Sequence, residues 1–177
     1  REFYGVITQE DFYMVRLDMT DEFPTVKNVI SAQTVKELCN HCDNKAIFLK
    51  ALAFLTPMPD PEKIICAGMN YHKPYPVEGM EGPDLTNIDI FSHHSKTVIG
   101  HGAVLQMPPG KAAESFDFEG EIVAGIGKSG RFIRKKNALE HIIGYSIINK
   151  GSVLDWMKHS VHAGKNFMLL EAGGHGS

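Results

Sequence analysis

The sequence predicts an α+β protein that is rich in strands, with a small N-terminal α+β domain over residues 1–60 and a larger domain over residues 61–177. Short runs of aromatic and β-branched residues recur along the chain, whereas helical patterns are few and short. Three prolines, Pro57, Pro59 and Pro61, mark the linker, because closely spaced prolines fit neither a helix nor a central strand. With 177 residues, 43% of them hydrophobic, the chain can bury one good core but not two large domains.

A hairpin and a helix are predicted before the linker. Residues 3–7 and 12–17 are strand-forming, and a polar turn separates them. Apolar residues then recur at helical spacing over residues 35–42, and Thr34 with Glu37 has the spacing of a capping box. Cys39 and Cys42 have C-x-x-C spacing, but no second pair follows at zinc spacing, which favours buried structural cysteines on this helix.

Strands dominate after the linker. The pattern predicts a buried strand at residues 63–69, a long polar loop rich in proline and glycine, and further strands at residues 88–91, 103–107, 116–126 and 145–149. Short helices are predicted at residues 138–142 and 153–161. The basic run over residues 131–136 is interpreted as a solvated face, and the glycines before it as turn residues, because no helix pattern follows them directly as a dinucleotide site requires.

Composition excludes several classes of function. The 18 Lys and Arg against 21 Asp and Glu leave a net charge of -3, so no basic excess is available for nucleic acid. Apolar runs fall short of the about 20 residues of a bilayer span, so we expect a soluble protein without a membrane partner. Three cysteines and the lack of an obvious leader favour the cytoplasm. The first residue is Arg1, and the last five are loop-like, so either end is compatible with a cut.

Three carboxylates share one face of the strand predicted at residues 116–126. Because side chains alternate along a strand, Asp117, Glu119 and Glu121 point to one side and apolar residues to the other. Ionised and partly buried neighbours would repel each other by about 2 kcal/mol, and a hard cation such as Mg²⁺ or Mn²⁺ would remove that repulsion. The alternative is a strand whose outer face is simply wet.

Three further segments, in the order in which they occur along the chain, match motifs of a known family. They are the strand and loop Asn-Tyr-His-x-x-Tyr-Pro-Val at residues 70–77, the Gly-Tyr strand at residues 144–149, and the motif His-Ser-Val-His-Ala-Gly-Lys-Asn-Phe at residues 159–167. Together with the carboxylate strand they resemble a bacterial branch of the fumarylacetoacetate hydrolase family. The resemblance covers residues 61–177, and the N-terminal segment is similar to the small domain that many members carry.

The resemblance implies a β-rich mixed fold of the fumarylacetoacetate hydrolase type and a homodimer or higher association. It also implies metal-dependent hydrolysis, decarboxylation or isomerisation of a small oxo-acid or 1,3-dicarbonyl substrate, in which Mg²⁺ or Mn²⁺ stabilises an enolate. By position in the motifs, the implied roles are metal binding for Glu119 and Glu121, catalysis for His72 and Lys165, and substrate binding for Tyr71 and His93.

The chain departs from the family pattern at several places, and two of these departures bear most on the site and the fold. Lys150 stands directly after the Asn of the Gly-Tyr strand, where the family has its third metal ligand, an Asp. An ammonium cannot ligate a metal, but it can neutralise Glu119 and Glu121, so the metal is expected to bind weakly or not at all. The chain also stops at Ser177, before the strands that complete the β core in the family, so the fold is expected to be incomplete at its C-terminal end.

Three interpretations of function therefore stay open. The first is a family enzyme acting on an oxo acid. The second is a non-catalytic or decayed relative with a structural role, and the third is a binding module that keeps the pocket for a small oxo acid without the chemistry. Metal content and saturable binding of oxalate or pyruvate would separate the three.

Overall fold

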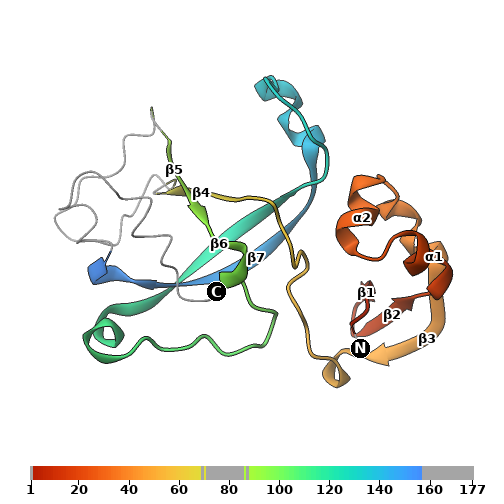
Figure 1. The fold of residues 1–177 in the computed structure, drawn as a ribbon, viewed down its shortest axis with the longest axis horizontal. Coiled ribbons are helices and arrows are strands. Elements are labelled where there is room, and N and C mark those ends of the chain that lie inside the picture. The colour runs from red at the N-terminus through yellow and green to blue at the C-terminus, as the bar shows by residue number, and fades with distance from the viewer. Residues whose placement is uncertain (1, 69, 71–85, 87, 157–177) are drawn as a thin grey trace. The chain divides into compact units, whose positions relative to one another are not determined.

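The structure, a computed structural model, describes residues 2–68, 70, 86 and 88–156 (Figure 1). Within this part of the chain, seven strands form one three-stranded and two two-stranded sheets, and short helices connect them. The predicted strand-rich α+β class is confirmed. No helix among the described residues is long and apolar enough to cross a membrane.

Contacts divide the chain into two compact units. The first contains Arg1–Asp60, Gly100–Ala103 and Gly120–Ile148, and the second contains Pro61–Ile99, Val104–Glu119 and Asn149–Ser177. One boundary between the units lies at the proline-rich linker. The simpler division into domains 1–60 and 61–177 stays a prediction.

An antiparallel sheet opens the first unit. Its strands β1 (Gly5–Thr8), β2 (Asp11–Val15) and β3 (Cys42–Phe48) lie in the order β1-β2-β3. The predicted N-terminal hairpin is confirmed, since β1 and β2 pair from Gly5 opposite Met14 to Thr8 opposite Asp11. The turn between them places Gln9 at a φ of 52°, in the left-handed region.

The core of this unit lies between the sheet and its helices. Two short helices, α1 (Leu17–Glu22) and α2 (Val26–Ser31), and a 3₁₀ helix at Val35–His41 each contribute an apolar side chain to it. The buried cluster consists of Val15, Met19, Val29 and Leu38. Sequence patterns did not predict α1 and α2, because six residues are too few to show a helical period.

The helix predicted over residues 35–42 is a correction. The segment forms a 3₁₀ helix, and Thr34 makes no side-chain cap; the capping box is instead formed by Thr25 and Asn28 at α2. A 3₁₀ helix has three residues per turn, so residues spaced for an α-helix no longer share one face. The prediction of two buried cysteines is accordingly wrong for Cys39, which is exposed, while Cys42 is half-buried and donates its thiol to the Leu38 carbonyl at 3.2 Å.

Strands β4 (Ile64–Gly68) and β5 (Asp89–His93) lie close to two predicted strands, and the structure pairs them antiparallel in the second unit. The strand predicted at residues 103–107 is wrong. That segment is irregular, and Val104 is 85% exposed. Gly102, at a φ of 79°, precedes it and two prolines follow it, so the backbone cannot extend a sheet there.

The longest elements are β6 (Phe116–Ile126) and β7 (Ile142–Val153), which pair with each other (Figure 1). The prediction of β6 is confirmed at both ends, whereas β7 extends beyond the predicted residues 145–149. The predicted helix at residues 138–142 overlaps a 3₁₀ helix at Lys135–His141, and further 3₁₀ helices lie at Leu49–Ala51, Ser95–Thr97 and Gly110–Ser115. Of the helix predicted at residues 153–161, residues 154–156 are helical and residues 157–161 lie outside the described part.

Candidate active site

Lys150 is buried near the end of β7. Its side chain is 8% exposed, and its Nζ lies 2.9 Å from Oε2 of Glu119 on β6, whose side chain is 30% exposed. The pairing of β6 with β7 brings the two residues together. Lysine is almost never buried without a partner, because removing an ammonium from water is costly unless an opposite charge offsets the loss. The predicted neutralisation of Glu119 by Lys150 is therefore seen as a direct ion pair.

Lys150 also contacts β5. Its Nζ lies 5.0 Å from the centre of the Phe91 ring, and Phe91 is 3% exposed. An ammonium over an aromatic face gains a favourable cation–π interaction, which is strongest where water is excluded. The Lys150 ammonium therefore has two partners, the Glu119 carboxylate and the Phe91 ring, which forms the apolar floor of the site.

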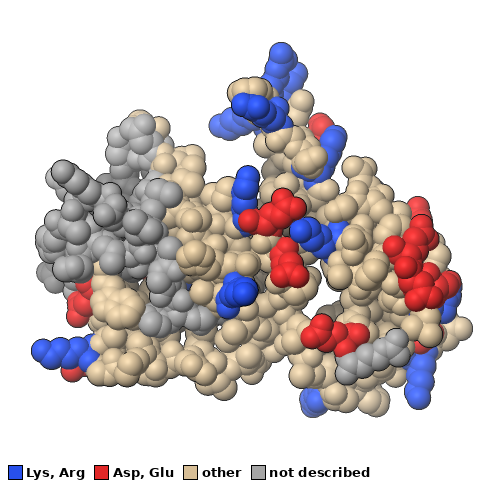
Figure 2. Space-filling model, in the orientation of Figure 1, with Lys and Arg blue, Asp and Glu red and all other residues tan. Residues whose placement is uncertain are grey.

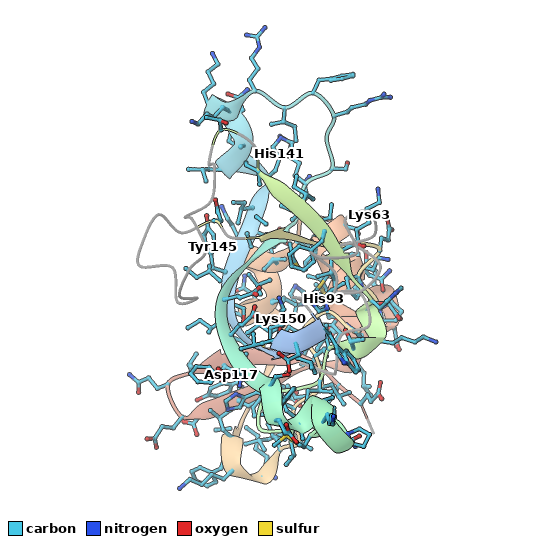
Figure 3. The ribbon with its side chains drawn as sticks, turned by 90° about the vertical axis from the view of Figure 1, so that its left-hand side faces the viewer. Lys63, His93, Asp117, His141, Tyr145 and Lys150 are labelled. Atoms are coloured by element: carbon cyan, nitrogen blue, oxygen red, sulfur yellow. The ribbon has the colours of Figure 1, made fainter. Side chains whose placement is uncertain are left out.

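His93 follows Phe91 on the same face of β5, with the two ring centres 6.0 Å apart. In Figure 3 the labelled His93 and Lys150 lie close together. The Nε2 atom of His93 is buried and has no hydrogen-bond partner among the described residues. Burial lowers the pKa of His93 below its ordinary value of 6.5, and the Lys150 ammonium lowers it further against the opposing effect of Glu119. His93 is therefore a neutral imidazole near pH 7, with one ring nitrogen available to accept a proton.

Two of the three acids on β6 are more buried than the apolar residues Phe118 and Ile122. Glu119 and Glu121 are half-buried, whereas Phe118 and Ile122 are 73% and 72% exposed. A strand with a wet polar face would show the opposite order, so that alternative does not describe Glu119. Asp117 differs from the other two acids, since it is exposed and its carboxylate accepts the backbone N–H of Phe118 at 2.8 Å.

Three predicted site residues cannot be placed. Tyr71 and His72 of the first motif and Lys165 of the last lie outside the described residues. Their roles in binding and catalysis stay predictions. The structure brings together Glu119, Lys150 and His93, which come from three different strands.

Comparison with known proteins identifies the family. A family model described as fumarylacetoacetate (FAA) hydrolase C-terminal matches residues 63–172, more than half of the chain. This chain belongs to the fumarylacetoacetate hydrolase family. The match includes β4 to β7 and therefore all three residues of the candidate site.

Curated relatives carry the name of one activity. A mitochondrial oxaloacetate tautomerase, fahd2 of Xenopus laevis, is 31% identical over 126 residues, which are 67% of this chain and 35% of the relative. Oxaloacetate tautomerase YisK of Bacillus subtilis is 36% identical over 103 residues, which are 58% of this chain and 34% of the relative. The chain thus spans about a third of the length of these relatives. The cytoplasmic location stays a prediction.

Solved structures confirm the fold. An HpcE protein from Mycobacterium smegmatis superposes with a TM-score of 0.68 at 20% identity, covering 88% of this chain and 54% of that one. A fumarylacetoacetate hydrolase from Exiguobacterium antarcticum superposes with a TM-score of 0.56 at 22% identity, covering 90% and 58%. The chain thus spans a little more than half of each of these structures.

The divalent metal that the family resemblance implies does not fit the described residues. No group of three or more His, Cys, Asp or Glu side chains among them could hold a metal ion. The nearest approach to such a group contains Glu119, and there the Lys150 ammonium lies at hydrogen-bond distance from the carboxylate. The Lys150 ammonium thus supplies a positive charge beside Glu119, and the weak or absent metal binding expected from residue 150 stays a prediction.

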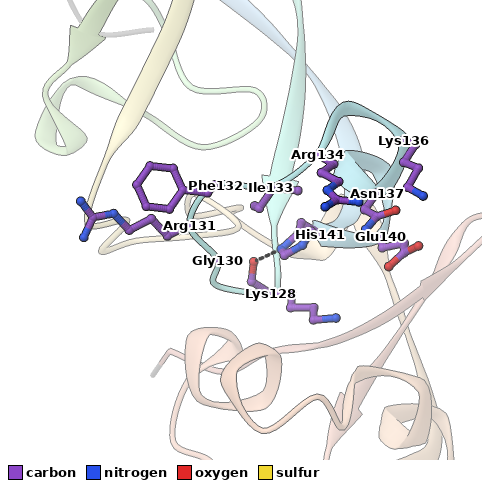
Figure 4. Close-up of a pocket in the computed structure, with 10 residues that line it drawn as sticks. All are labelled: Lys128, Gly130, Arg131, Phe132, Ile133, Arg134, Lys136, Asn137, Glu140 and His141. Atoms are coloured by element: carbon purple, nitrogen blue, oxygen red, sulfur yellow. Dashed lines mark hydrogen bonds between the residues drawn. The ribbon is translucent and has the colours of Figure 1, made fainter.

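A hollow lies at the loop between β6 and β7 (Figure 4). Its volume is about 470 Å³, and its lining includes Lys128, Arg131, Arg134 and Lys136. Figure 2 shows Lys and Arg side chains at that end of the hairpin, and Figure 4 labels those that line the hollow. His141 there is bonded through Nδ1 to the Lys128 carbonyl at 2.8 Å. The basic residues are exposed, which confirms the predicted solvated face and makes this hollow a poorer candidate than the buried cluster.

The sequence did not predict that Phe91 contacts Lys150 and forms the floor of the site. It named His93 for substrate binding and gave no role to Phe91. One signal for both was present: alternation along residues 88–93 places Phe91 and His93 on one face of a strand. That this face lies against Lys150 depends on the packing of β5 on β7, which no local pattern encodes.

Proposed function

We propose that this chain carries part of an enzyme site that isomerises a 2-oxo acid between its keto and enol forms, with an oxaloacetate-like dicarboxylate as substrate. The observation that supports this most is the buried Lys150 ammonium, paired with Glu119 and adjacent to a neutral His93. Two relatives named oxaloacetate tautomerase favour isomerisation over the hydrolysis or decarboxylation that the family also performs.

The reaction needs a base and a positive charge. A 2-oxo acid carries a carbonyl at C2 and acidic protons at C3. A base removes one C3 proton, the electron pair moves to the C2 oxygen, and protonation of that oxygen gives the enol with no net change in atoms. His93 can accept the proton through its buried Nε2, and the Lys150 ammonium can donate a hydrogen bond to the enolate oxygen.

The size of the charge effect is adequate for catalysis. A unit charge about 4 Å from the enolate oxygen is worth about 4 kcal/mol at an effective dielectric near 20. Even part of this, realised only when the negative charge forms, would accelerate enolisation by roughly 10²- to 10³-fold. Lys150 would thus supply electrostatically what a divalent cation would otherwise supply.

The test follows the ultraviolet absorbance of oxaloacetate enol as it converts to the keto form. The wild-type chain should accelerate the decay, Lys150→Met should abolish the acceleration, and His93→Gln should reduce it strongly. Lys50→Met is the matched control, because Lys50 is an exposed lysine of the first unit. An equal rate for wild type and Lys150→Met would refute the proposed role of the site.

A binding function without turnover is the second candidate. It is favoured by the same ion pair, since a carboxylate and an ammonium that satisfy each other can be purely structural. Titration with oxalate, a non-reacting mimic of a 2-oxo acid, separates the two. Saturable oxalate binding that Lys150→Met abolishes, together with no effect on enol decay, would support a binding module.

A further inference from the structure

We propose that Cys39 and Cys42 are a redox-active pair that closes to a reversible disulfide by exchange with a low-molecular-weight disulfide such as oxidised glutathione. Both cysteines lie in the first compact unit, whereas Lys150 and Glu119 belong to the second. The inference therefore goes beyond the proposed function and does not depend on it. It gives a role to the C-x-x-C spacing, which a buried structural pair does not explain, because Cys39 is exposed.

The backbone between the two cysteines brings their Cα atoms within reach of a disulfide. Cys39 lies in the 3₁₀ helix Val35–His41, and Cys42 is the residue at which this helix ends. Residues three apart lie one above the other in a 3₁₀ helix, and a rise of about 2.0 Å per residue separates their Cα atoms by about 6 Å. Disulfides join Cα atoms that are about 4.4–6.8 Å apart. The pair can therefore close with little rearrangement of the helix.

The thiol of Cys42 already lies beside the backbone of Cys39. It donates a hydrogen bond to the Leu38 carbonyl at 3.2 Å, and this carbonyl belongs to the peptide group that joins Leu38 to Cys39. Because that peptide group is planar, Sγ of Cys42 lies within about 6 Å of the Cys39 Cα. Burial raises the pKa of the Cys42 thiol, and the nearby Cys39 raises it further, which agrees with two side chains that lie close together.

The two sulfurs differ in their access to solvent. Cys39 is exposed, so a bulky disulfide can reach its sulfur, whereas Cys42 is half-buried and packs against the buried core cluster of the first unit. Thiol–disulfide exchange requires that the attacking thiolate reach a sulfur of the disulfide. Cys39 is therefore the residue that attacks, and Cys42 is the residue that resolves the mixed disulfide.

The exchange balances in atoms and electrons. Cys39 loses its proton, and its thiolate attacks one sulfur of oxidised glutathione, which forms a mixed disulfide and releases one glutathione thiolate. Cys42 then loses its proton and attacks Sγ of Cys39, which closes the protein disulfide and releases the second glutathione thiolate. The two protein thiols are oxidised, and oxidised glutathione is reduced to two molecules of glutathione, which take up the two protons. The Arg16 guanidinium, which donates a hydrogen bond to the Cys42 carbonyl at 3.4 Å, favours the thiolate needed in the second step.

The disulfide should be readily reversible. A bridge that encloses only two residues removes little entropy from the unfolded chain, so the folded state gains little stability from oxidation. Oxidation also removes the thiol proton that Cys42 donates to Leu38. Exposed disulfides without a large stabilising effect are the ones that free thiols reduce most easily.

The experiment equilibrates the wild-type chain with reduced and oxidised glutathione, quenches the exchange with acid, and labels the remaining thiols before peptide mass spectrometry. We expect Cys39 and Cys42 to lose their labels together and to be joined within one chain. Diluting both forms of glutathione by about tenfold at a fixed ratio should raise the ratio of disulfide to dithiol by about tenfold, because two molecules of reduced glutathione are consumed for each disulfide that opens.

Variants distinguish the pair from a single modified thiol. Cys42→Ser should accumulate the mixed disulfide of Cys39 with glutathione, and the ratio of this adduct to the free thiol should not change on dilution. Cys66→Ser is the matched control, since it removes the third cysteine and keeps the pair, and it should behave as the wild type does.

Three results would overturn the proposal. The first is a wild-type chain whose oxidised fraction ignores dilution, since that is the behaviour of a mixed disulfide. The second is a disulfide that joins two chains, which a non-reducing gel shows as a linked dimer. The third is a pair that stays reduced in an excess of oxidised glutathione. The dilution measurement uses only the wild type, so it needs no variant to fold, and none of these results bears on the proposed function at Lys150.

Discussion

At the scale of single residues, the main departure from the family pattern lies at residue 150. Lys150 replaces an expected acidic ligand with a cation, and the structure places that cation against Glu119. Lys150 offsets the charge of Glu119 without a bound metal ion. The charge balance of Glu119 then relies on this one ion pair. Removing one member of a buried pair is more costly than never having had the pair, because the other charge is left without compensation.

Lys150→Met tests this dependence. The variant should lose about 1–3 kcal/mol of unfolding free energy, less than for a fully buried pair because Glu119 is partly exposed. Urea denaturation measures the loss, and Lys50→Met should leave stability within about 0.5 kcal/mol of the parent. Equal midpoints for parent and Lys150→Met would show that the ion pair contributes nothing.

The histidine gives a pH dependence with a definite sign. Because the folded state lowers the pKa of His93 below 6.5, the unfolded chain binds more protons in mildly acid solution. The stability contributed by neutral His93 is full above pH 6.5 and is lost as pH falls through the lowered pKa. Thermal melts between pH 7.5 and 5 should therefore fall more for the wild type than for His93→Gln. Parallel pH profiles would contradict the burial of the imidazole.

Individual residues were predictable where chain position alone fixed their role. Glu119 and Lys150 were paired from their places in two motifs, and the structure shows their contact. Glu121 shares the face of Glu119, but its assignment to a metal is still a prediction. The contact of Phe91 with Lys150 could not be predicted, since it depends on how β5 packs. The exposure of Cys39 could not be predicted either, because the apolar spacing did not distinguish a 3₁₀ helix from an α-helix.

Close packing between β6 and β7 fixes the site at the scale of elements. Gly151 follows Lys150 directly, and a Cβ added there would lie 2.7 Å from Cζ of Phe116. The glycine therefore lets the Phe116 ring pack against the backbone of β7.

Long strands such as β6 were predicted well because alternation persists over many residues, whereas six-residue helices and short 3₁₀ segments lack a readable period.

Gly151→Ala should accordingly lower stability by about 1–3 kcal/mol, because the ring or the strand must shift to admit a methyl group. Gly144→Ala is the matched control, since it also lies on β7 and its added Cβ would have no neighbour within 4 Å. Denaturation of the two variants under one condition compares them. A Gly151→Ala variant as stable as the control would show that Phe116 does not pack there.

An exposed apolar surface on β6 and β7 is the main feature at the scale of the whole chain. Phe118 and Ile122 are 73% and 72% exposed, and Tyr145 and Ile147 are 65% and 84% exposed. Such surfaces usually mark contacts between chains. The sequence predicted the apolar face of β6, but it could not show how much of β7 stays exposed, because burial depends on contacts that are distant along the chain.

We therefore expect the purified chain to associate. Sizing chromatography should show oligomers at micromolar concentration, and Ile147→Lys should shift the elution toward the monomer by placing a charge on the surface. Ser146→Lys adds the same charge at a neighbouring exposed polar position and should have little effect. A sharp monomer peak for the wild type, together with a cooperative melt, would contradict this expectation.

The most direct test of the central claim, that Lys150 occupies the place of a metal ion beside Glu119, is the thermal melt of Lys150→Asp with and without Mg²⁺ or Mn²⁺. Without metal, the third carboxylate should repel the glutamates and lower stability by about 1–3 kcal/mol. Added metal should recover the loss, with about 2.7 kcal/mol of stabilisation at a hundredfold excess over its dissociation constant, while the wild type should not respond. A variant whose melting temperature ignores the ion, or a wild type that responds equally, would contradict the account.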